Sequence, residues 1–249
     1  FKKKGMKVVG VDPAKNLSTL ANKKGIFTYG EFFNKKTVKK IQRKYKKKVK
    51  LILCFNTFAH SENLRAIVKN IHDILDERGT FVFECQYLRD VYDKKILGTI
   101  FHEHMYHHSV SSLSNLFDYF NLNLYDAKLV NIQKGSILGF VTKNKSKNKT
   151  KEILKLKNIE EKKGYISNKK FDDLRKFIIN QQKEAKRIIK RFDKNKIGSY
   201  GSARSGPTYA LNFSLSKYIK FIFDDHPLKV NKFTSFLNIK VRPTKDIIK

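Results

Sequence analysis

The sequence predicts a mixed α/β protein, with a mostly parallel sheet covered by helices and a second, smaller α/β domain after it. Two observations lead to this prediction. Short apolar runs alternate with segments of helical spacing, which is typical of a parallel sheet with helices on its faces. A segment at residues 143–151, rich in Lys, Asn and Ser and free of apolar side chains, then predicts a boundary between two domains.

The first domain is placed at residues 1–143. Apolar runs predict buried strands at residues 7–11, 49–55 and 80–84. Helical spacing predicts helices at residues 14–24, 32–48, 62–75 and 111–120. Two closing strands, expected to be antiparallel, are placed at residues 124–130 and 136–142.

The second domain is placed at residues 144–249. Its first long helix is expected at residues 171–192, where apolar side chains recur broadly in phase. Residues 196–201 start a further α/β unit, and its next strand at residues 219–223 ends in Asp224.

The net charge of +32 raises the question of a nucleic-acid partner. Only nine of the 54 basic residues are Arg, whereas base readers and phosphate clamps favour the Arg fork. The Lys residues are also spread along the whole chain. We therefore expect no nucleic-acid partner, and keep a polyanion-binding protein as the lesser alternative.

Two cysteines, Cys54 and Cys85, both lie in apolar strand-like runs and are expected to be buried thiols of a cytoplasmic protein. Two thiols alone make neither a disulfide framework nor a zinc cage, so no metal site is expected in this chain. No run reaches the ~18 apolar residues of a membrane span, so no membrane partner is expected either.

Polar and aromatic residues follow the first two predicted strands, where open α/β sheets bind ligands. Asp12 could accept hydrogen bonds from ribose hydroxyls or cap the next helix, and the local pattern favours neither. Asn56, Phe58 and His60 could meet an adenine, although taken alone they indicate an ordinary strand–helix loop.

A His-rich stretch at residues 102–108 follows the third strand. The spacing of His104 and His108 would suit a shared metal site on a helix, but the zinc-protease pattern His-Glu-x-x-His is absent. The stretch could also supply a general base oriented by a carboxylate. Spacing alone favours a surface loop. The glycine-bearing loop at residues 198–206 is a weak phosphate-binding signal.

Taken together, these segments resemble the family of sugar C-methyltransferases. The resemblance rests on the run at residues 83–88, then His102-Glu103-His104, then Gly135-Ser136, and in the second domain on residues 200–203 and 224–229. It covers nearly all of the chain in the expected order.

The resemblance implies a partial Rossmann-like methyltransferase domain, dependent on S-adenosylmethionine, followed by an α/β domain that helps to hold a nucleotide-sugar. Such proteins also carry an N-terminal zinc-binding module. This chain is expected to begin after that module and after the first strand and glycine-rich turn. Zinc is therefore expected only in the missing part, and the fragment is expected to be inactive alone.

The implied reaction is C-methylation of a nucleotide-linked 4-keto-deoxysugar through an enolate. His104 corresponds to the family's general base with Glu103 as its helper, and Asp12 corresponds to the ribose-binding acid. Asn56, Phe58 and His60 are expected at the cofactor. Residues expected to contact the nucleotide-sugar are Tyr87, Tyr200, Ser202, Arg204, Asp224 and Lys229.

The chain departs from the family pattern in three places. Phe101 replaces a Tyr and so lacks a hydroxyl, and Gln86 replaces a Pro. After residues 224–229, Asn231 and Ser235-Phe236 stand where the family has Gly and Pro-Gly. The main alternative is methylation of an oxygen or nitrogen in another acceptor on the same scaffold. The sugar, the nucleotide, the stereochemistry and the oligomeric state are left open.

Overall fold

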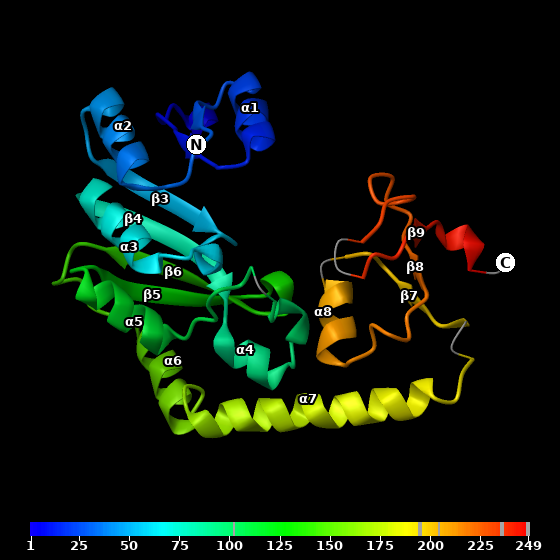
Figure 1. Cartoon of the computed structure of the whole chain (residues 1–249). Helices are drawn as coiled ribbons and strands as arrows, with labels where there is room; N and C mark the ends of the chain where they lie inside the picture. Colours follow the sequence, from blue (N-terminus) through cyan, green and yellow to red (C-terminus); the bar gives the residue numbers. More distant parts are fainter. Residues whose placement is uncertain (102, 194–195, 204, 235–236, 248–249) are drawn as a thin grey trace. The chain divides into compact units, whose positions relative to one another are not determined.

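The computed structural model describes residues 1–101, 103–193, 196–203, 205–234 and 237–247. Its contacts divide the chain into two compact units. The first comprises Phe1–Gln86 and His108–Ile159, and the second comprises Tyr87–His107 and Glu160–Lys249. Both units contain helices and strands (Figure 1), which confirms the predicted mixed α/β fold.

A four-stranded sheet forms the core of the first unit, in the order β3-β4-β6-β5. The pairing of β3 with β4 is parallel, whereas β6 runs antiparallel to both of its neighbours, as predicted for the closing strands. The strands of this sheet are β3 (Val49–Phe55), β4 (Leu75–Gln86), β5 (Asn123–Val130) and β6 (Ser136–Thr142).

Aromatic side chains fill the core beside this sheet. Phe81 and Phe83 on β4 pack with Phe58 and Phe117, with ring centroids 5.3–6.1 Å apart. On the neighbouring strand Gly139 lies opposite Phe83, and a Cβ there would come within 2.3 Å of the Phe83 ring. A glycine is therefore required at this strand position so that the ring can cross it.

Side-chain caps set where the helices of this unit begin. Asn34 accepts from the Thr37 N–H, Asn63 from the Ala66 N–H, and Ser109 and Ser112 form a reciprocal capping box. The helices of the first unit are α1 (Lys15–Lys23), α2 (Lys35–Tyr45), α3 (Leu64–Ile74) and α5 (Val110–Tyr119), followed by α6 (Lys151–Lys162), which continues into the second unit.

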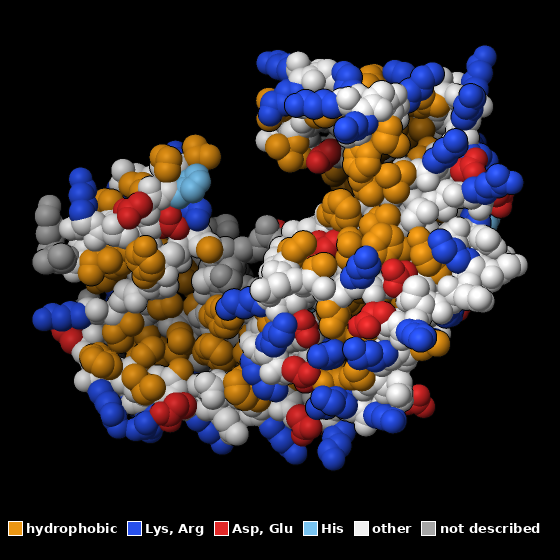
Figure 2. All heavy atoms as spheres, turned by 180° about the vertical axis from the view of Figure 1, so that it is seen from behind, with side chains coloured by type: hydrophobic (Ala, Val, Ile, Leu, Met, Phe, Trp, Pro, Cys, Tyr) orange, Lys and Arg blue, Asp and Glu red, His pale blue; other side chains and the backbone are white. Residues whose placement is uncertain are grey.

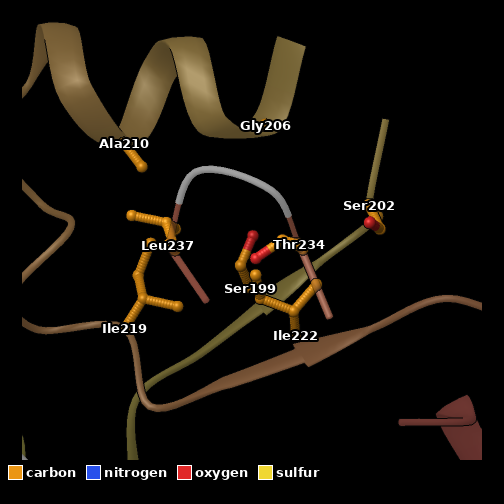
Figure 3. A pocket seen from close by; sticks show the side chains of 9 residues that line it. Ser199, Ser202, Gly206, Ala210, Ile219, Ile222, Thr234 and Leu237 are labelled. Atoms are coloured by element: carbon orange, nitrogen blue, oxygen red, sulfur yellow. The ribbon is translucent and has the colours of Figure 1, made fainter. Parts of the chain in front are cut away.

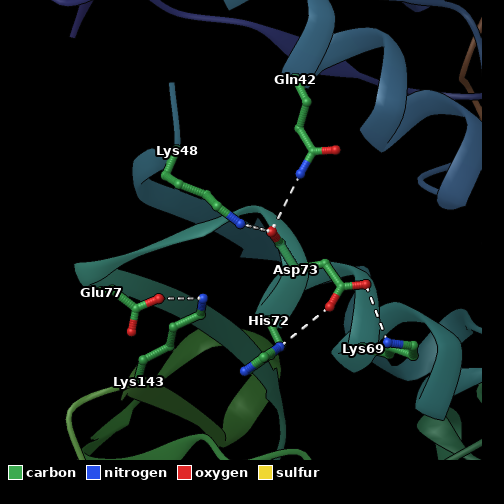
Figure 4. Close-up of polar contacts among 7 residues, drawn as sticks. All are labelled: Gln42, Lys48, Lys69, His72, Asp73, Glu77 and Lys143. Carbon is green, nitrogen blue, oxygen red and sulfur yellow. Dashed lines mark hydrogen bonds and ion pairs between the residues drawn. The ribbon is translucent and has the colours of Figure 1, made fainter. Parts of the chain in front are cut away.

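The end of α3 is fastened to α2 and to the segment before β3 (Figure 4). The Asp73 carbonyl accepts hydrogen bonds from Gln42 and Lys48, and its carboxylate contacts Lys69 and His72, each at 3.3 Å. These contacts hold the turn from α3 into β4.

A small parallel pair, β1 (Gly10–Val11) with β2 (Thr28–Tyr29), lies in the same unit. Val9 and Val11 pack into a cluster centred on Val38 and Ile41 of α2, together with Val49 and Ile52 of β3. This shared apolar cluster joins β1 to β3. Among the described residues, no hydrogen-bonded pairing links these two strands.

The second unit contains the long helix α7 (Asn168–Ile189) and a parallel three-stranded sheet in the order β7-β8-β9. Its remaining elements are β7 (Gly198–Tyr200), β8 (Phe221–Phe223), β9 (Val241–Arg242), α4 (Leu88–Asp93), α8 (Ser205–Asn212) and the short 3₁₀ helix η3 (Leu97–Thr99), which packs against α8. Among the described residues, no helix is long and apolar enough to cross a bilayer.

Lys and Arg side chains are scattered over the face of the molecule seen in Figure 2 and do not gather into one stripe. This distribution follows from the even spread of Lys along the sequence.

Candidate active site

Asp12 follows β1 directly, and one of its carboxylate oxygens is already in use. Oδ1 accepts a 2.8 Å hydrogen bond from the Ala14 N–H, at the start of α1. Oδ2 has no partner among the described residues, and the side chain is half-buried. Asp12 therefore fixes the turn that leads into α1, which itself has no side-chain cap hydrogen bond, and one oxygen remains for a ligand hydroxyl.

Asn56 and Glu84 are brought together at the carboxyl ends of the parallel strands β3 and β4. The Asn56 N–H donates both to the Glu84 main-chain carbonyl, at 3.1 Å, and to Glu84 Oε2, at 3.0 Å. Asn56 itself has a left-handed backbone, with φ of 49°, and is exposed. The buried Glu84 carboxylate thus fixes the loop on which Asn56 lies.

Phe58 and His60 lie on the short 3₁₀ helix η2 (Phe58–His60) that follows this loop. The Phe58 side chain is 1% exposed and packs against the rings of Phe83, Phe117 and His108. Its ring therefore belongs to the core and offers no face to an adenine in this structure. His60 is half-buried.

Tyr87 begins the second unit and is fully buried. Its hydroxyl donates a 2.8 Å hydrogen bond to Oε1 of Glu160, which is also fully buried. Burial, together with the negative charge of Glu160, raises the pKa of Tyr87 well above its ordinary value. Tyr87 is thus a neutral donor in the interior, and its hydroxyl is committed to Glu160.

The His-rich loop lies between η3 and α5 and carries a row of three rings. The Phe101 and His104 rings have centroids 4.4 Å apart, and the His107 ring lies edge-on to His104 at 6.0 Å. Glu103 is exposed beside His104. His102 lies outside the described residues.

The His107 side chain is half-buried, whereas the adjacent His108 is 5% exposed. Both ring nitrogens of His107 are buried and have no hydrogen-bond partner within the part of the chain that the structure describes. Burial also lowers the pKa of His107, which favours the neutral imidazole.

The glycine loop of the second unit is organised by Asp224. Its carboxylate accepts hydrogen bonds from the Ser202 N–H and the His226 N–H, each at 2.8 Å, and from Lys229 Nζ at 3.1 Å. These donors, in that combination, lower the pKa of Asp224 to about 2, with the His226 N–H as the largest cause. The structure therefore brings Ser202, Asp224 and Lys229 together.

A small cavity lies beside this loop, between β7, β8 and the start of α8 (Figure 3). Ser199, Ser202, Ile222 and Thr234 are among the residues that line it. Its volume of about 10 Å³ admits roughly one water molecule, so a nucleotide would have to lie on the outer surface of the loop. There Tyr200 is 78% exposed, and Arg204 falls outside the described residues.

A larger hollow of about 400 Å³ lies at the other end of the first unit's sheet, where Thr80 pairs with Thr142. Lys143 lines it and is bound by Glu77 at 2.9 Å, as Figure 4 shows. Because it lies at the amino end of β4, this hollow is separate from the ligand edge marked by Asn56 and Glu84.

Within the described ranges, no group of three His, Cys, Asp or Glu side chains is arranged to hold a metal ion. The Cys54 thiol has its pKa raised to about 12, mainly by burial and further by the charge of Glu84, so it stays protonated. Cys85 is buried and free.

The sequence reasoning missed Glu84 and Glu160. Glu84 was noticed only as part of a motif, although an acid inside a strand of apolar residues is itself a signal, since Glu is rarely buried without a partner. Glu160 gave no signal, because it lies among exposed charged residues on α6.

Comparison with known proteins places the chain in a family. Residues 1–127 match the family model of a methyltransferase domain, and residues 131–249 match that of the C-terminal domain of C-methyltransferases. The first match covers more than half of the chain, so the chain belongs to the methyltransferase family, with a C-methyltransferase C-terminal domain after it.

One curated relative is the C-methyltransferase NovU from Streptomyces niveus. It is 31% identical over 140 residues, which are 56% of this chain and 33% of that protein. The chain thus spans about a third of the length of this relative.

Two solved structures resemble about half of the chain. The first is magnesium protoporphyrin IX methyltransferase (ChlM) from Synechocystis PCC 6803, with a TM-score of 0.42 and 15% identity; the match covers 56% of this chain and 66% of that one. The second is an S-adenosylmethionine-dependent methyltransferase from Clostridium acetobutylicum, with a TM-score of 0.41 and 14% identity; the match covers 55% of this chain and 75% of that one. Scores this low support no inference about the chain.

Proposed function

We propose that the protein transfers a methyl group from S-adenosylmethionine to a carbon of a nucleotide-linked 4-keto-deoxysugar. The observation that carries this proposal is the order of the two family matches, a methyltransferase domain followed directly by the C-terminal domain of C-methyltransferases. A relative that shares 31% identity over 140 residues is itself described as a C-methyltransferase.

The residues at the carboxyl ends of β1, β3 and β4 suit S-adenosylmethionine. Asp12 keeps a carboxylate oxygen for a ribose hydroxyl, and the loop of Asn56 is held in place by buried Glu84. When bound, S-adenosylmethionine supplies a methyl group on a positively charged sulfur, which a carbon nucleophile can attack. A buried carboxylate near this edge is compatible with that positive charge.

The chain's own residues would generate the nucleophile. A ketone acidifies the hydrogen on the neighbouring carbon, so a neutral imidazole can remove it near neutral pH. We assign this step to His104, with exposed Glu103 beside it in the loop. The carbon–hydrogen bond breaks, its proton passes to the imidazole, and its electron pair enters the enolate. The enolate carbon then forms the new bond to the methyl group as the carbon–sulfur bond breaks.

The loop of Ser202, Asp224 and Lys229 is the part of the second unit that we assign to the nucleotide-sugar. Lys229 Nζ brings positive charge to the same carboxylate that holds the Ser202 N–H, and Tyr200 offers an exposed ring beside them. Arg204 stays in this assignment on sequence grounds alone. Tyr87 supports the second unit through its buried hydrogen bond to Glu160, and Phe58 supports the first unit as part of its core.

The test is the identity of the bond formed. The full-length enzyme is incubated with S-adenosylmethionine carrying an isotopically labelled methyl group and with dTDP-, UDP- and GDP-linked 4-keto-6-deoxyhexoses, and the product is examined by carbon NMR. We expect the label on a ring carbon in at least one case and no transfer to dTDP-glucose, which has no ketone. Transfer to oxygen or nitrogen would support the alternative acceptor class, and no transfer to any keto-sugar would overturn the proposal.

A further inference from the structure

Buried polar groups without partners are rare in folded proteins, and His107 is such a group. Both of its ring nitrogens are buried and have no hydrogen-bond partner among the described residues. A neutral imidazole has one N–H donor and one acceptor nitrogen, and leaving both unmade opposes folding. The arrangement is understandable if a ligand of the protein completes these hydrogen bonds.

The neighbours of His107 indicate which ligand that is. Its ring lies edge-on to the ring of His104, with centroids 6.0 Å apart, on the same loop. The next ring in the row, Phe101, packs on His104 at 4.4 Å and carries no hydrogen-bond donor. In a substrate whose acidic carbon meets His104, the ketone carbon is the next atom. Its oxygen would then face a row in which, of the three rings described, the other N–H donor is that of His107.

The environment of His107 makes it a better hydrogen-bond donor than a base. Burial lowers the pKa of His107, so this ring resists taking up a proton and is a poor base near neutral pH. A neutral imidazole of lowered pKa is nevertheless an effective N–H donor to a carbonyl oxygen, a use of histidine known from enolising enzymes. His107 is therefore suited to donate a hydrogen bond, and the base role in this loop is left to His104.

We propose that His107 is a catalytic residue that donates its N–H to the ketone oxygen of the keto-sugar while His104 removes the adjacent carbon-bound proton. This inference rests on the proposed function and deepens it. When the carbon–hydrogen bond breaks, its proton goes to His104 and negative charge develops on the ketone oxygen, where the His107 N–H stabilises it without giving up its proton. No oxidant or further reactant is needed.

Matched substitutions at the two histidines test this division of roles. Glutamine has an N–H₂ donor but cannot act as a base, so His107→Gln should keep methyl transfer to a dTDP-linked 4-keto-6-deoxyhexose within about tenfold of wild type, whereas His104→Gln should lose about 10²–10⁴-fold in kcat. His107→Phe, which keeps a ring but loses the donor, should lose about 10²–10³-fold in kcat. Tyr106→Phe, which removes the neighbouring hydroxyl, is the control and should match wild type.

The opposite pattern, in which His107→Gln is inactive and His104→Gln active, would overturn the assignment. So would a His107→Phe variant with wild-type kcat, or a Tyr106→Phe variant that loses the activity. If wild type itself transfers no methyl group to any nucleotide-linked keto-sugar, the proposed function fails and this inference fails with it. If wild type is active and His107→Phe is unaffected, the inference alone fails.

A measurement on the wild-type protein keeps the test independent of variant folding. Ring-nitrogen NMR of labelled histidine follows His107 while the dTDP-linked keto-sugar is added without S-adenosylmethionine. We expect the His107 N–H resonance to shift with the keto-sugar and not with dTDP alone, because the ketone is the group it binds. An unchanged His107 resonance in the presence of bound keto-sugar would overturn the proposal.

Discussion

The hydroxyl of Tyr87 donates a 2.8 Å hydrogen bond to Oε1 of Glu160, and neither side chain is exposed to solvent. The two residues are far apart in the sequence and join the segment before α4 to α6. Nearby, Tyr165 donates to Asp93 at 2.5 Å and so ties the same two regions a second time. Because Tyr87 and Glu160 are both buried, loss of either partner would leave the other with an unsatisfied polar group, which is costly.

Tyr87→Phe should therefore lower the free energy of unfolding by about 1–3 kcal/mol, because the Glu160 carboxylate loses a buried donor. Urea unfolding followed by circular dichroism measures this change. Tyr119→Phe is the matched control, since the Tyr119 side chain is 70% exposed, and it should be nearly neutral. Equal effects of the two substitutions would show that the Tyr87 hydroxyl adds nothing to stability.

Asp224 gives a prediction for acid stability. Hydrogen bonds from the His226 and Ser202 N–H groups and from Lys229 lower the folded-state pKa of Asp224 to about 2, against an ordinary value of 3.8. Because the folded-state pKa is depressed, the stability that this carboxylate contributes is present above pH 3.8 and is lost as the pH falls through about 2.

Asp224→Asn should consequently be less stable than wild type at neutral pH, and the difference should shrink as the pH falls from 3.8 towards 2. Thermal unfolding across that pH range measures the difference. Asp172→Asn, a change at an exposed carboxylate on α7, should show no such convergence. A gap between wild type and Asp224→Asn that stays constant with pH would contradict the assigned hydrogen bonds.

Asp12 combines a hydrogen bond that fixes the turn before α1 with a proposed cofactor role, and two substitutions separate them. Asparagine keeps an oxygen for the Ala14 N–H, so Asp12→Asn should preserve most of the stability, while Asp12→Ala should lose about 0.5–1.5 kcal/mol. Both should weaken binding of S-adenosylmethionine by about 1–3 kcal/mol, because each removes the charged acceptor proposed for the ribose. If calorimetry on the full-length enzyme shows unchanged affinity in both variants, Asp12 serves only to fix the turn before α1.

Much of the first unit could be predicted from hydrophobic periodicity. The strand β3 was predicted at its observed bounds, and the antiparallel closing strands were also confirmed, because long apolar runs bounded by turns define their own ends. The strands β2 and β9 and the helix α4 were missed, because elements this short are determined by tertiary contacts and not by local spacing. The helix α6 was missed as well, because most of its residues are charged or polar.

The site could be predicted less fully, since side-chain pairing depends on contacts distant in sequence. Asp12 and Asn56 were placed correctly at strand ends because a strand's direction follows from the pattern. Phe58 has the same local signal, yet its ring lies in the core, because it packs against Phe81, Phe83 and Phe117, a contact between distant segments that the sequence does not reveal. The hydrogen bonds of Asp224 and the burial of the His107 ring nitrogens could not be predicted from the sequence either.

Glu84 is the remaining charged group at the proposed cofactor edge. Its carboxylate is 3% exposed, accepts from the Asn56 N–H and forms no salt bridge with any described residue. A buried carboxylate without a cationic partner is stabilised when a positive ligand binds nearby. The positively charged sulfur of S-adenosylmethionine provides such a charge, whereas the sulfur of S-adenosylhomocysteine is neutral.

Glu84→Gln keeps the shape of the side chain and an oxygen for the Asn56 N–H but removes the charge. Its affinity for S-adenosylmethionine should therefore fall about tenfold more than its affinity for S-adenosylhomocysteine, a difference of about 1.4 kcal/mol, because only S-adenosylmethionine carries a positive charge. Titration calorimetry with both ligands measures the two affinities. Glu84→Ala, which also removes the acceptor for Asn56, should weaken both ligands further, because the left-handed loop loses its anchor. Equal losses for the two ligands in Glu84→Gln would mean that Glu84 acts only by positioning Asn56 and not through its charge.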